Sequence, residues 1–148
     1  MGANIVLQAL AAKKPACDLQ ENSEEVYNNL QRAGMYRTAL LHGGKSQEMR
    51  EECIKGFREG EYSVMIATDV AGRGIDVKDV GLVVNYDMPH TIEHYTHRIG
   101  RTGRAGRRGT AVTFLTAADD KTFYDLKHLL EVCARDGHIY VYEADEHV

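Results

Sequence analysis

The chain of 148 residues is 43% hydrophobic and 27% charged, with a formal net charge of −4. This composition excludes global disorder and a surface that is basic throughout, and the length predicts one domain, residues 1–148, with a core of its own. No apolar run is as long as a bilayer span and no basic leader precedes one, so we expect a soluble, intracellular protein with no membrane partner.

Short apolar runs alternate with amphipathic stretches along the chain. The runs predict strands at 4–10, 37–41, 62–67, 82–86 and 110–115. Most of them are apolar almost throughout, which is typical of strands covered by helices on both faces. Strands that alternate with helices also predict right-handed crossovers. We therefore expect an α/β fold with an open, mostly parallel sheet, followed at 134–148 by a tail or an extra strand.

The amphipathic stretches predict four helices. Asn22 or Ser23 is expected to cap the start of the first, and Ser46 and Gly60 are expected to begin and end the second. The apolar faces of the last three helices are expected to contain Met49, Cys53 and Phe57, then Ile92, Tyr95 and Ile99, and then Phe123, Leu126, Leu129, Leu130 and Cys133.

The loop after the second predicted strand reads H-G-G-K-S at 42–46, ending like a phosphate-binding loop. Such a loop needs a glycine five residues before Gly44, where this chain has Ala39. We therefore interpret the segment as a helix N-terminus whose free N–H groups suit a phosphate, with Gln47 and Arg50 one turn apart beside it. A tight strand-to-helix turn with a solvated arginine explains the pattern equally well.

The loop after the third predicted strand reads A-T-D-V-A-G-R-G-I-D at 67–76. The strand ends in a hydroxyl and a carboxylate, Thr68 and Asp69, and the loop then carries Arg73 and Asp76. A strand-end aspartate can hold Mg²⁺, although a cap is its more frequent role. Four polar side chains exceed what a connection needs, and Asp76 is suited to hydrogen-bond a ribose hydroxyl.

The segment 97–104 reads H-R-I-G-R-T-G-R and places Arg98, Arg101 and Arg104 at three-residue spacing. Guanidinium groups match phosphate oxygens, and the glycines between them allow a close approach. A disordered Arg-Gly tract that binds RNA loosely and a solvated basic loop are the alternatives. The amphipathic stretch before the segment and the apolar strand after it favour an ordered loop. Nothing in it holds the rest of a nucleotide, so we expect half of an active site.

Neither the cysteines nor the histidines predict a metal site. The three cysteines are widely spaced and form no Cys-x-x-Cys pair, so we expect buried free thiols, which favours the cytosol or nucleus. His90, His94 and His97 could share one helix face, but their neighbours offer few further ligands. We expect surface or bridging histidines.

Taken in order, these segments resemble the second lobe of a DEAD-box RNA helicase. H-G-G-K-S-Q-x-x-R at 42–50 resembles motif IVa, A-T-D-V-A-G-R-G-I-D at 67–76 motif V, V-V-N-Y-D-M-P at 83–89 its usual successor, and H-R-I-G-R-T-G-R at 97–104 motif VI. The resemblance covers residues 35–130. Residues 1–34 are atypical, because the first strand lacks the phenylalanine of motif IV and the stretch that follows is long. G-K-S-Q-E, I-E-H-Y-T-H-R and F-Y-D-L-K resemble the spliceosomal member that acts at the 5′ splice site.

The resemblance implies a RecA-like fold, with ATP in a cleft between two lobes and single-stranded RNA across both. It implies that Arg104 is the arginine finger, that Arg101 is its companion at the γ-phosphate, and that Gly74 and Asp76 contact the ribose. The RNA-backbone contacts that it implies are Gly43, Gly44, Arg50 and Thr68. It also implies that Arg73 and His97 contact the other lobe, and that Arg98 pairs with the Asp69 loop in a structural role.

ATP and Mg²⁺ would be held mainly by an N-terminal lobe that carries the P-loop lysine and the D-E-A-D residues. The implied partners are RNA, that N-terminal lobe and spliceosomal proteins, with a nuclear or otherwise cytoplasmic location. The isolated 148 residues would be inactive. A non-catalytic RNA- or protein-binding module with the same fold is the alternative, and a self-contained P-loop NTPase is excluded by Ala39.

Overall fold

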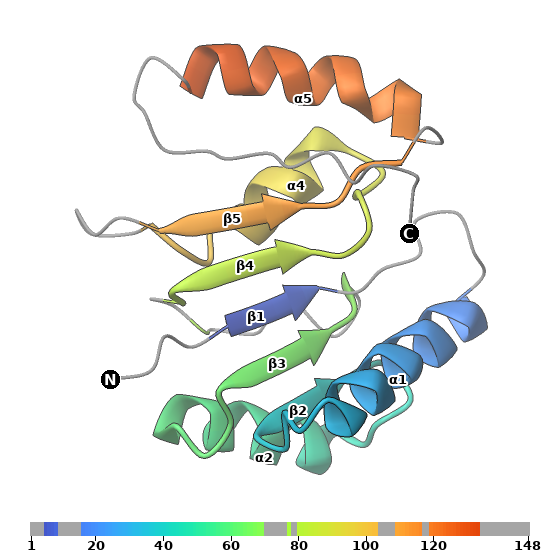
Figure 1. The fold of residues 1–148 in the computed structure, drawn as a ribbon, viewed down its shortest axis with the longest axis vertical. Helices are drawn as coiled ribbons and strands as arrows, with labels where there is room; N and C mark the ends of the chain where they lie inside the picture. The colour runs from blue at the N-terminus through green and yellow to red at the C-terminus, as the bar shows by residue number, and fades with distance from the viewer. Residues whose placement is uncertain are drawn as a thin grey trace.

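Five parallel strands form one sheet in the order β2-β3-β1-β4-β5 (Figure 1). The computed structural model describes residues 5–8, 16–69, 77, 80–103, 109–116 and 119–133. The strands are β1 Ile5–Gln8, β2 Thr38–Leu41, β3 Val64–Ala67, β4 Leu82–Asn85 and β5 Thr110–Thr113. The helices are α1 Ala16–Arg32, α2 Gln47–Glu59, α4 Ile92–Ile99 and α5 Asp120–Cys133. The expected α/β architecture with a parallel sheet is confirmed.

Helices cover both faces of the sheet, as the apolar strands predict. Successive strand residues point to opposite faces, and Leu40 packs against α1 whereas Leu41 packs with Phe57 of α2. Ile99 of α4 packs against the same core as Phe57. In Figure 1, α5 lies beyond β5 and against α4, where Leu126 shares a second core with Tyr95.

The strand that lacks the expected phenylalanine occupies the centre of the sheet. Ile5 pairs in register with Val64 of β3 and with Leu82 of β4. Val6 is buried in the main core. The departure from the family pattern therefore leaves the central strand in place, because a two-sided apolar environment requires only a hydrophobic side chain there.

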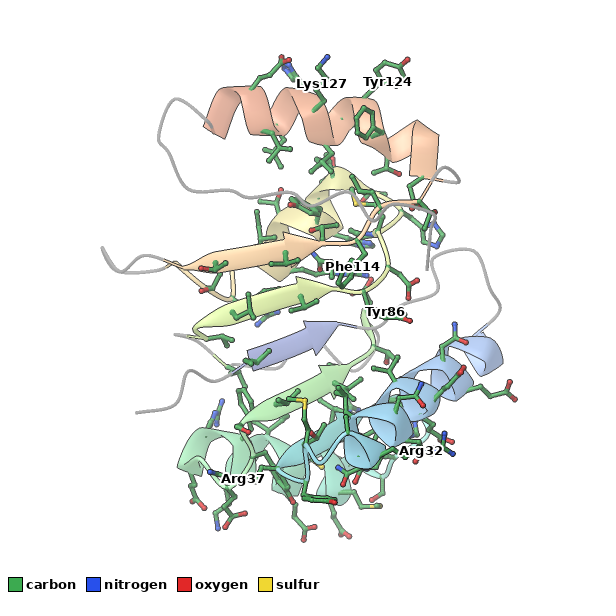
Figure 2. The ribbon with its side chains drawn as sticks, in the orientation of Figure 1. Arg32, Arg37, Tyr86, Phe114, Tyr124 and Lys127 are labelled. Carbon is green, nitrogen blue, oxygen red and sulfur yellow. The ribbon has the colours of Figure 1, made fainter. Side chains whose placement is uncertain are left out.

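The boundaries of α2 agree with the sequence prediction. The Ser46 hydroxyl accepts a hydrogen bond from the Met49 N–H at 3.3 Å, and Gly60 ends the helix with a φ of 79°. The Arg37 guanidinium also donates to the carbonyls of Gly60 and Glu61 at this end (labelled in Figure 2). A cation beside exposed helix carbonyls is favourable. Arg37 therefore ties β2 to the C-terminus of α2.

The prediction for the start of α1 was wrong. The helix begins at Ala16, so Asn22 and Ser23 lie inside it and cap nothing. Ser23 is completely buried. Cap propensity is a local preference that a continuing helix overrides when its face is packed against a sheet. The expected strand or tail at 134–148 lies outside the described residues.

Two residues expected on apolar helix faces are exposed. Met49 is half exposed on α2, although Cys53 and Phe57 pack as expected. Phe123 is half exposed on α5, where its ring lies edge-on to Tyr124. Both stand near the first turn of their helices, whereas the buried residues Phe57 of α2 and Leu126 of α5 lie on later turns.

Candidate functional site

The loops that carry the sequence motifs leave the sheet at one edge. Because all strands are parallel, their carboxyl ends point the same way (Figure 1), and ligands bind at such edges in open α/β sheets. Leu41 is in register with Ala67, and Asn85 with Thr113. The Thr68 N–H donates to the Leu41 carbonyl at 3.1 Å, which joins the first two motif loops directly.

An ion pair between a buried arginine and a half-buried aspartate connects the third motif to the second. Arg98 of α4 is 3% exposed, and its Nε and Nη2 atoms each donate to a carboxylate oxygen of Asp69 at 2.8 Å. Its Nη1 donates to the Asp87 carbonyl at 2.9 Å. A buried guanidinium is tolerated only when it is paired in this way. The pairing of Arg98 with the Asp69 loop, which the family resemblance implies, is present.

A neutral polar chain continues this network into the sheet. Arg98 Nη1 lies 3.5 Å from the Asn85 amide oxygen, and the Asn85 amide donates to the Thr113 hydroxyl at 3.1 Å. The Thr113 hydroxyl in turn lies 3.5 Å from the Tyr95 hydroxyl. All four residues are buried. Sequence reasoning missed Asn85 and Thr113, although a buried asparagine at the end of an apolar strand is a signal for such a network.

Backbone and side-chain hydrogen bonds hold the described part of the arginine loop, Gly100 to Gly103. The Arg101 N–H donates to the Arg98 carbonyl at 3.1 Å, and the Arg101 carbonyl accepts from Val80 at 3.3 Å. The Thr102 hydroxyl donates to the Val80 carbonyl, and Gly103 has a φ of 69°. Arg101 is half-buried on this loop. This agrees with an ordered loop rather than a disordered Arg-Gly tract over these residues.

The start of β5 passes against the arginine loop with no room for a side chain. A Cβ at Gly109 would lie 2.2 Å from the Thr102 hydroxyl and 2.3 Å from the Gly103 nitrogen. Such distances are impossible without movement of the backbone. The packing of the arginine loop therefore requires glycine at position 109, which the sequence analysis missed; the glycine immediately before an apolar strand was the available signal.

The first motif forms a turn anchored on His42. The Lys45 N–H donates to the His42 carbonyl at 3.2 Å, and the Gly44 N–H donates to His42 Nδ1 at 3.2 Å. Gly43 and Gly44 are exposed at the turn. On α2, Arg50 donates to the side chain of Gln47 at 3.3 Å, so the two residues expected to reach one anion lie together.

The structure describes six of the ten predicted site residues. Gly43, Gly44 and His97 are exposed, Arg50 and Arg101 are half-buried, and Thr68 is buried. The other four lie outside the described residues: Arg73, Gly74, Asp76 and Arg104.

The described residues provide neither a triphosphate cradle nor a metal cluster. Ala39, which stands where a phosphate-binding loop needs glycine, is buried within β2. Among these residues, no group of three or more His, Cys, Asp or Glu side chains could hold a metal ion. On α4, His97 is exposed and His94 is half-buried. In the same part of the chain, no helix is both long and apolar enough to cross a bilayer.

The polar edge also carries an exposed aromatic pair. Tyr86 and Phe114 follow β4 and β5, and Figure 2 shows them together at the carboxyl end of the sheet. Their rings meet edge to face with centroids 6.2 Å apart, and the residues are 48% and 39% exposed. Sequence reasoning assigned them to strands without predicting this exposure.

Known proteins share this domain. Residues 11–106 match the family model of the helicase conserved C-terminal domain. The chain is 52% identical over 120 residues to DEAD-box ATP-dependent RNA helicase 21 of Oryza sativa. The aligned region covers 79% of this chain and 16% of that protein. It is 56% identical over 108 residues to the pre-mRNA-splicing ATP-dependent RNA helicase PRP28 of Cryptococcus neoformans. This aligned region covers 73% of this chain and 14% of that protein.

A solved structure agrees with these relatives. The RNA helicase Prp28 from Chaetomium thermophilum, crystallised with ADP, is 41% identical and superposes with a TM-score of 0.77 over 99% of this chain and 32% of that one. The chain therefore spans less than a third of the length of these proteins. Family model, relatives, fold and ordered motifs agree, and the chain belongs to the helicase conserved C-terminal domain family, with a RecA-like fold shared with DEAD-box RNA helicases.

Proposed function

We propose that this chain works as the C-terminal lobe of an ATP-dependent RNA helicase, which hydrolyses ATP and locally separates RNA strands when its two lobes close. The observation that carries the proposal is the Arg98–Asp69 pair, which fixes the motif VI helix against the motif V strand. It holds the arginine loop at the same sheet edge as the other motif loops.

In this proposal the arginine loop meets the phosphates of ATP. Arg104 stabilises the charge that develops on the transferring γ-phosphoryl group, and Arg101 acts beside it. Gly74 and Asp76 contact the ribose. The rest of ATP and its Mg²⁺ would be held mainly by the N-terminal lobe, as the family resemblance implies. Arg73 and His97 engage that lobe when the cleft closes.

The other half of the proposed site binds RNA. The exposed Gly43–Gly44 turn stands at the N-terminal end of α2, whose N–H groups and dipole favour a phosphate. Arg50 and Gln47 lie together on the first turn of the same helix. With the neighbouring Thr68 they would bind the backbone of one strand, without reading its bases.

The resemblance to the splicing helicases supports a more specific role. We infer that the whole protein remodels RNA or RNA–protein complexes during pre-mRNA splicing, in the nucleus and alongside spliceosomal proteins. The relative named above as a pre-mRNA-splicing helicase is 56% identical to the chain over 108 residues. Depletion of the whole protein should then lead to unspliced transcripts, and normal splicing after depletion would contradict this role.

The first prediction tests the arginines in a two-lobed protein. In a chimera where this chain replaces the C-terminal lobe of Chaetomium thermophilum Prp28, Arg104→Ala should reduce RNA-stimulated ATP hydrolysis by about three to five orders of magnitude. Lys127→Ala is the matched control, because Lys127 points outward from α5, away from the motif edge (Figure 2).

The outcome separates two functions. If the unmodified chimera hydrolyses ATP and Arg104→Ala turns over at the same rate, the arginine-finger assignment is wrong. If the chimera binds RNA but never hydrolyses ATP, the alternative holds and the chain is a non-catalytic RNA-binding module with a RecA-like fold. Hydrolysis by the isolated chain at a helicase-like rate would exclude both.

A further inference from the structure

His42 of the first motif connects the end of β2, helix α1 and the Gly43–Gly44 turn. It directly follows the buried end of β2, and its side chain is buried between α1 and the Gly43–Gly44 turn. Both hydrogen bonds that close the turn end on His42: its carbonyl accepts from Lys45, and its Nδ1 accepts from Gly44. On the opposite side of the ring, Nε2 lies 3.6 Å from a carboxylate oxygen of Glu24 in α1.

This geometry selects one chemical form of the ring. An imidazole nitrogen that accepts an N–H bond carries no proton, so the single proton of the neutral ring is on Nε2, where it faces Glu24. Either the other tautomer or the imidazolium would place an N–H against the Gly44 N–H. The turn would then lose one of its two closing bonds.

The surroundings keep the ring neutral. Burial lowers the pKa of His42, the Lys45 ammonium lowers it further, and the Glu24 carboxylate opposes them. These are the charged groups that face the ring among the described residues, one from its own turn and one from α1. The pKa of His42 is therefore lowered, which favours the neutral ring.

We propose that His42 is a positioning residue for RNA binding. Its unprotonated Nδ1 holds the Gly43–Gly44 turn in the geometry that binds the RNA backbone. The inference rests on the proposed function, since it gives the turn a phosphate to bind. Beyond the proposed function, it requires that Nδ1 of His42 accept a hydrogen bond, and it gives RNA binding a direction of pH dependence. Acidification that protonates Nδ1 opens the turn and weakens RNA binding, although added positive charge alone would strengthen it.

Two substitutions separate the two ring nitrogens. His42→Asn places an amide oxygen near the position of Nδ1, where it can accept from Gly44 but does not titrate. His42→Gln extends toward the position of Nε2 and leaves the Gly44 N–H without its acceptor. In the chimera described above, the affinity for fluorescein-labelled oligouridylate is measured by anisotropy with a non-hydrolysable ATP analogue, between pH 5 and pH 8.

The expected pattern is specific. At neutral pH, His42→Gln weakens RNA binding by up to about tenfold, because the turn loses one of its two closing hydrogen bonds, whereas His42→Asn stays within about threefold of the unmodified protein. On acidification the unmodified protein loses affinity relative to His42→Asn, whose profile lacks this loss. Nitrogen NMR of the isolated chain should show the Nε2–H tautomer at neutral pH.

Each failure has its own meaning. If the unmodified chimera does not bind RNA, the proposed function is wrong. If it binds and His42→Gln binds equally well, or if acidification strengthens binding relative to His42→Asn, the positioning role is overturned and the proposed function stands. Should His42→Gln fail to fold, the comparison of pH profiles between the unmodified protein and His42→Asn still decides the question.

Discussion

The α4 side of the site is held by the ion pair of the buried Arg98 with Asp69, whereas the α2 side is held by neutral hydrogen bonds around a turn with an exposed tip. Arg98 makes three short bonds of 2.8–2.9 Å to Asp69 and Asp87. The turn at 42–45 is closed by two bonds of 3.2 Å that both end on His42. The α4 side, which is expected to stabilise a developing charge, is thus fixed by an ion pair. The α2 side, which is expected to follow a flexible RNA backbone, is held by longer neutral hydrogen bonds.

This contrast suits two different tasks. Stabilising a transition state requires donors fixed before the reaction, because reorganising them costs energy during the step. Backbone recognition of single-stranded RNA tolerates small adjustments, since phosphates recur along the strand. The difference predicts that substitutions on the α4 side change the free energy of unfolding, and that those on the α2 side change RNA binding.

The largest expected effect on folding comes from breaking the buried pair. Asp69→Asn leaves the Arg98 guanidinium buried without its carboxylate, and we expect it to lower the free energy of unfolding by about 3 kcal/mol. Urea denaturation of the chain measures this loss. Asp125→Asn, at an exposed position of α5, is the matched control and should change stability by less than about 0.5 kcal/mol. Equal stability of the two variants would contradict the structural role of the pair.

A somewhat smaller effect is expected where β5 crosses the arginine loop. Gly109→Ala should cost about 1–3 kcal/mol, because the new methyl group overlaps Thr102 and Gly103. Gly34→Ala provides a contrast, since Gly34 has a φ of 85° and no atom within 4 Å of an added Cβ, so its cost of about 1 kcal/mol would be conformational only. In the chimera, Gly109→Ala should also slow ATP hydrolysis through the displaced loop, and Gly34→Ala should not.

The smallest expected change is on the α2 side. Arg50→Ala should lower the slope of RNA affinity against salt concentration by up to about one phosphate contact, with little change in stability. Anisotropy titrations of the chimera at several salt concentrations measure this slope. Lys55→Ala, which removes a more exposed cation further along α2, should leave it unaltered. An equal slope for Arg50→Ala and the unmodified protein would remove Arg50 from the RNA contacts.

Much of the fold could be predicted because the relevant signals are local. Five apolar runs predicted five strands to within a few residues, and Ser46 and Gly60 were correctly placed at the ends of α2. The family resemblance also implied that Arg98 pairs with the Asp69 loop, and the structure contains this pair. The start of α1 was missed, because a local cap signal cannot show where packing lets a helix continue.

The sequence by itself determined the strand and helix types, the motif order and hence the family, since these depend on residues close together in the chain. Only the tertiary structure decided that β1 is the central strand, that Asn85 and Tyr95 extend the Arg98 network, and that Gly109 must have no side chain. These features join residues far apart in the chain, and no periodicity specifies which distant partners meet. The motif loops could therefore be located from the sequence, but the contacts that hold them in place are a property of the folded sheet.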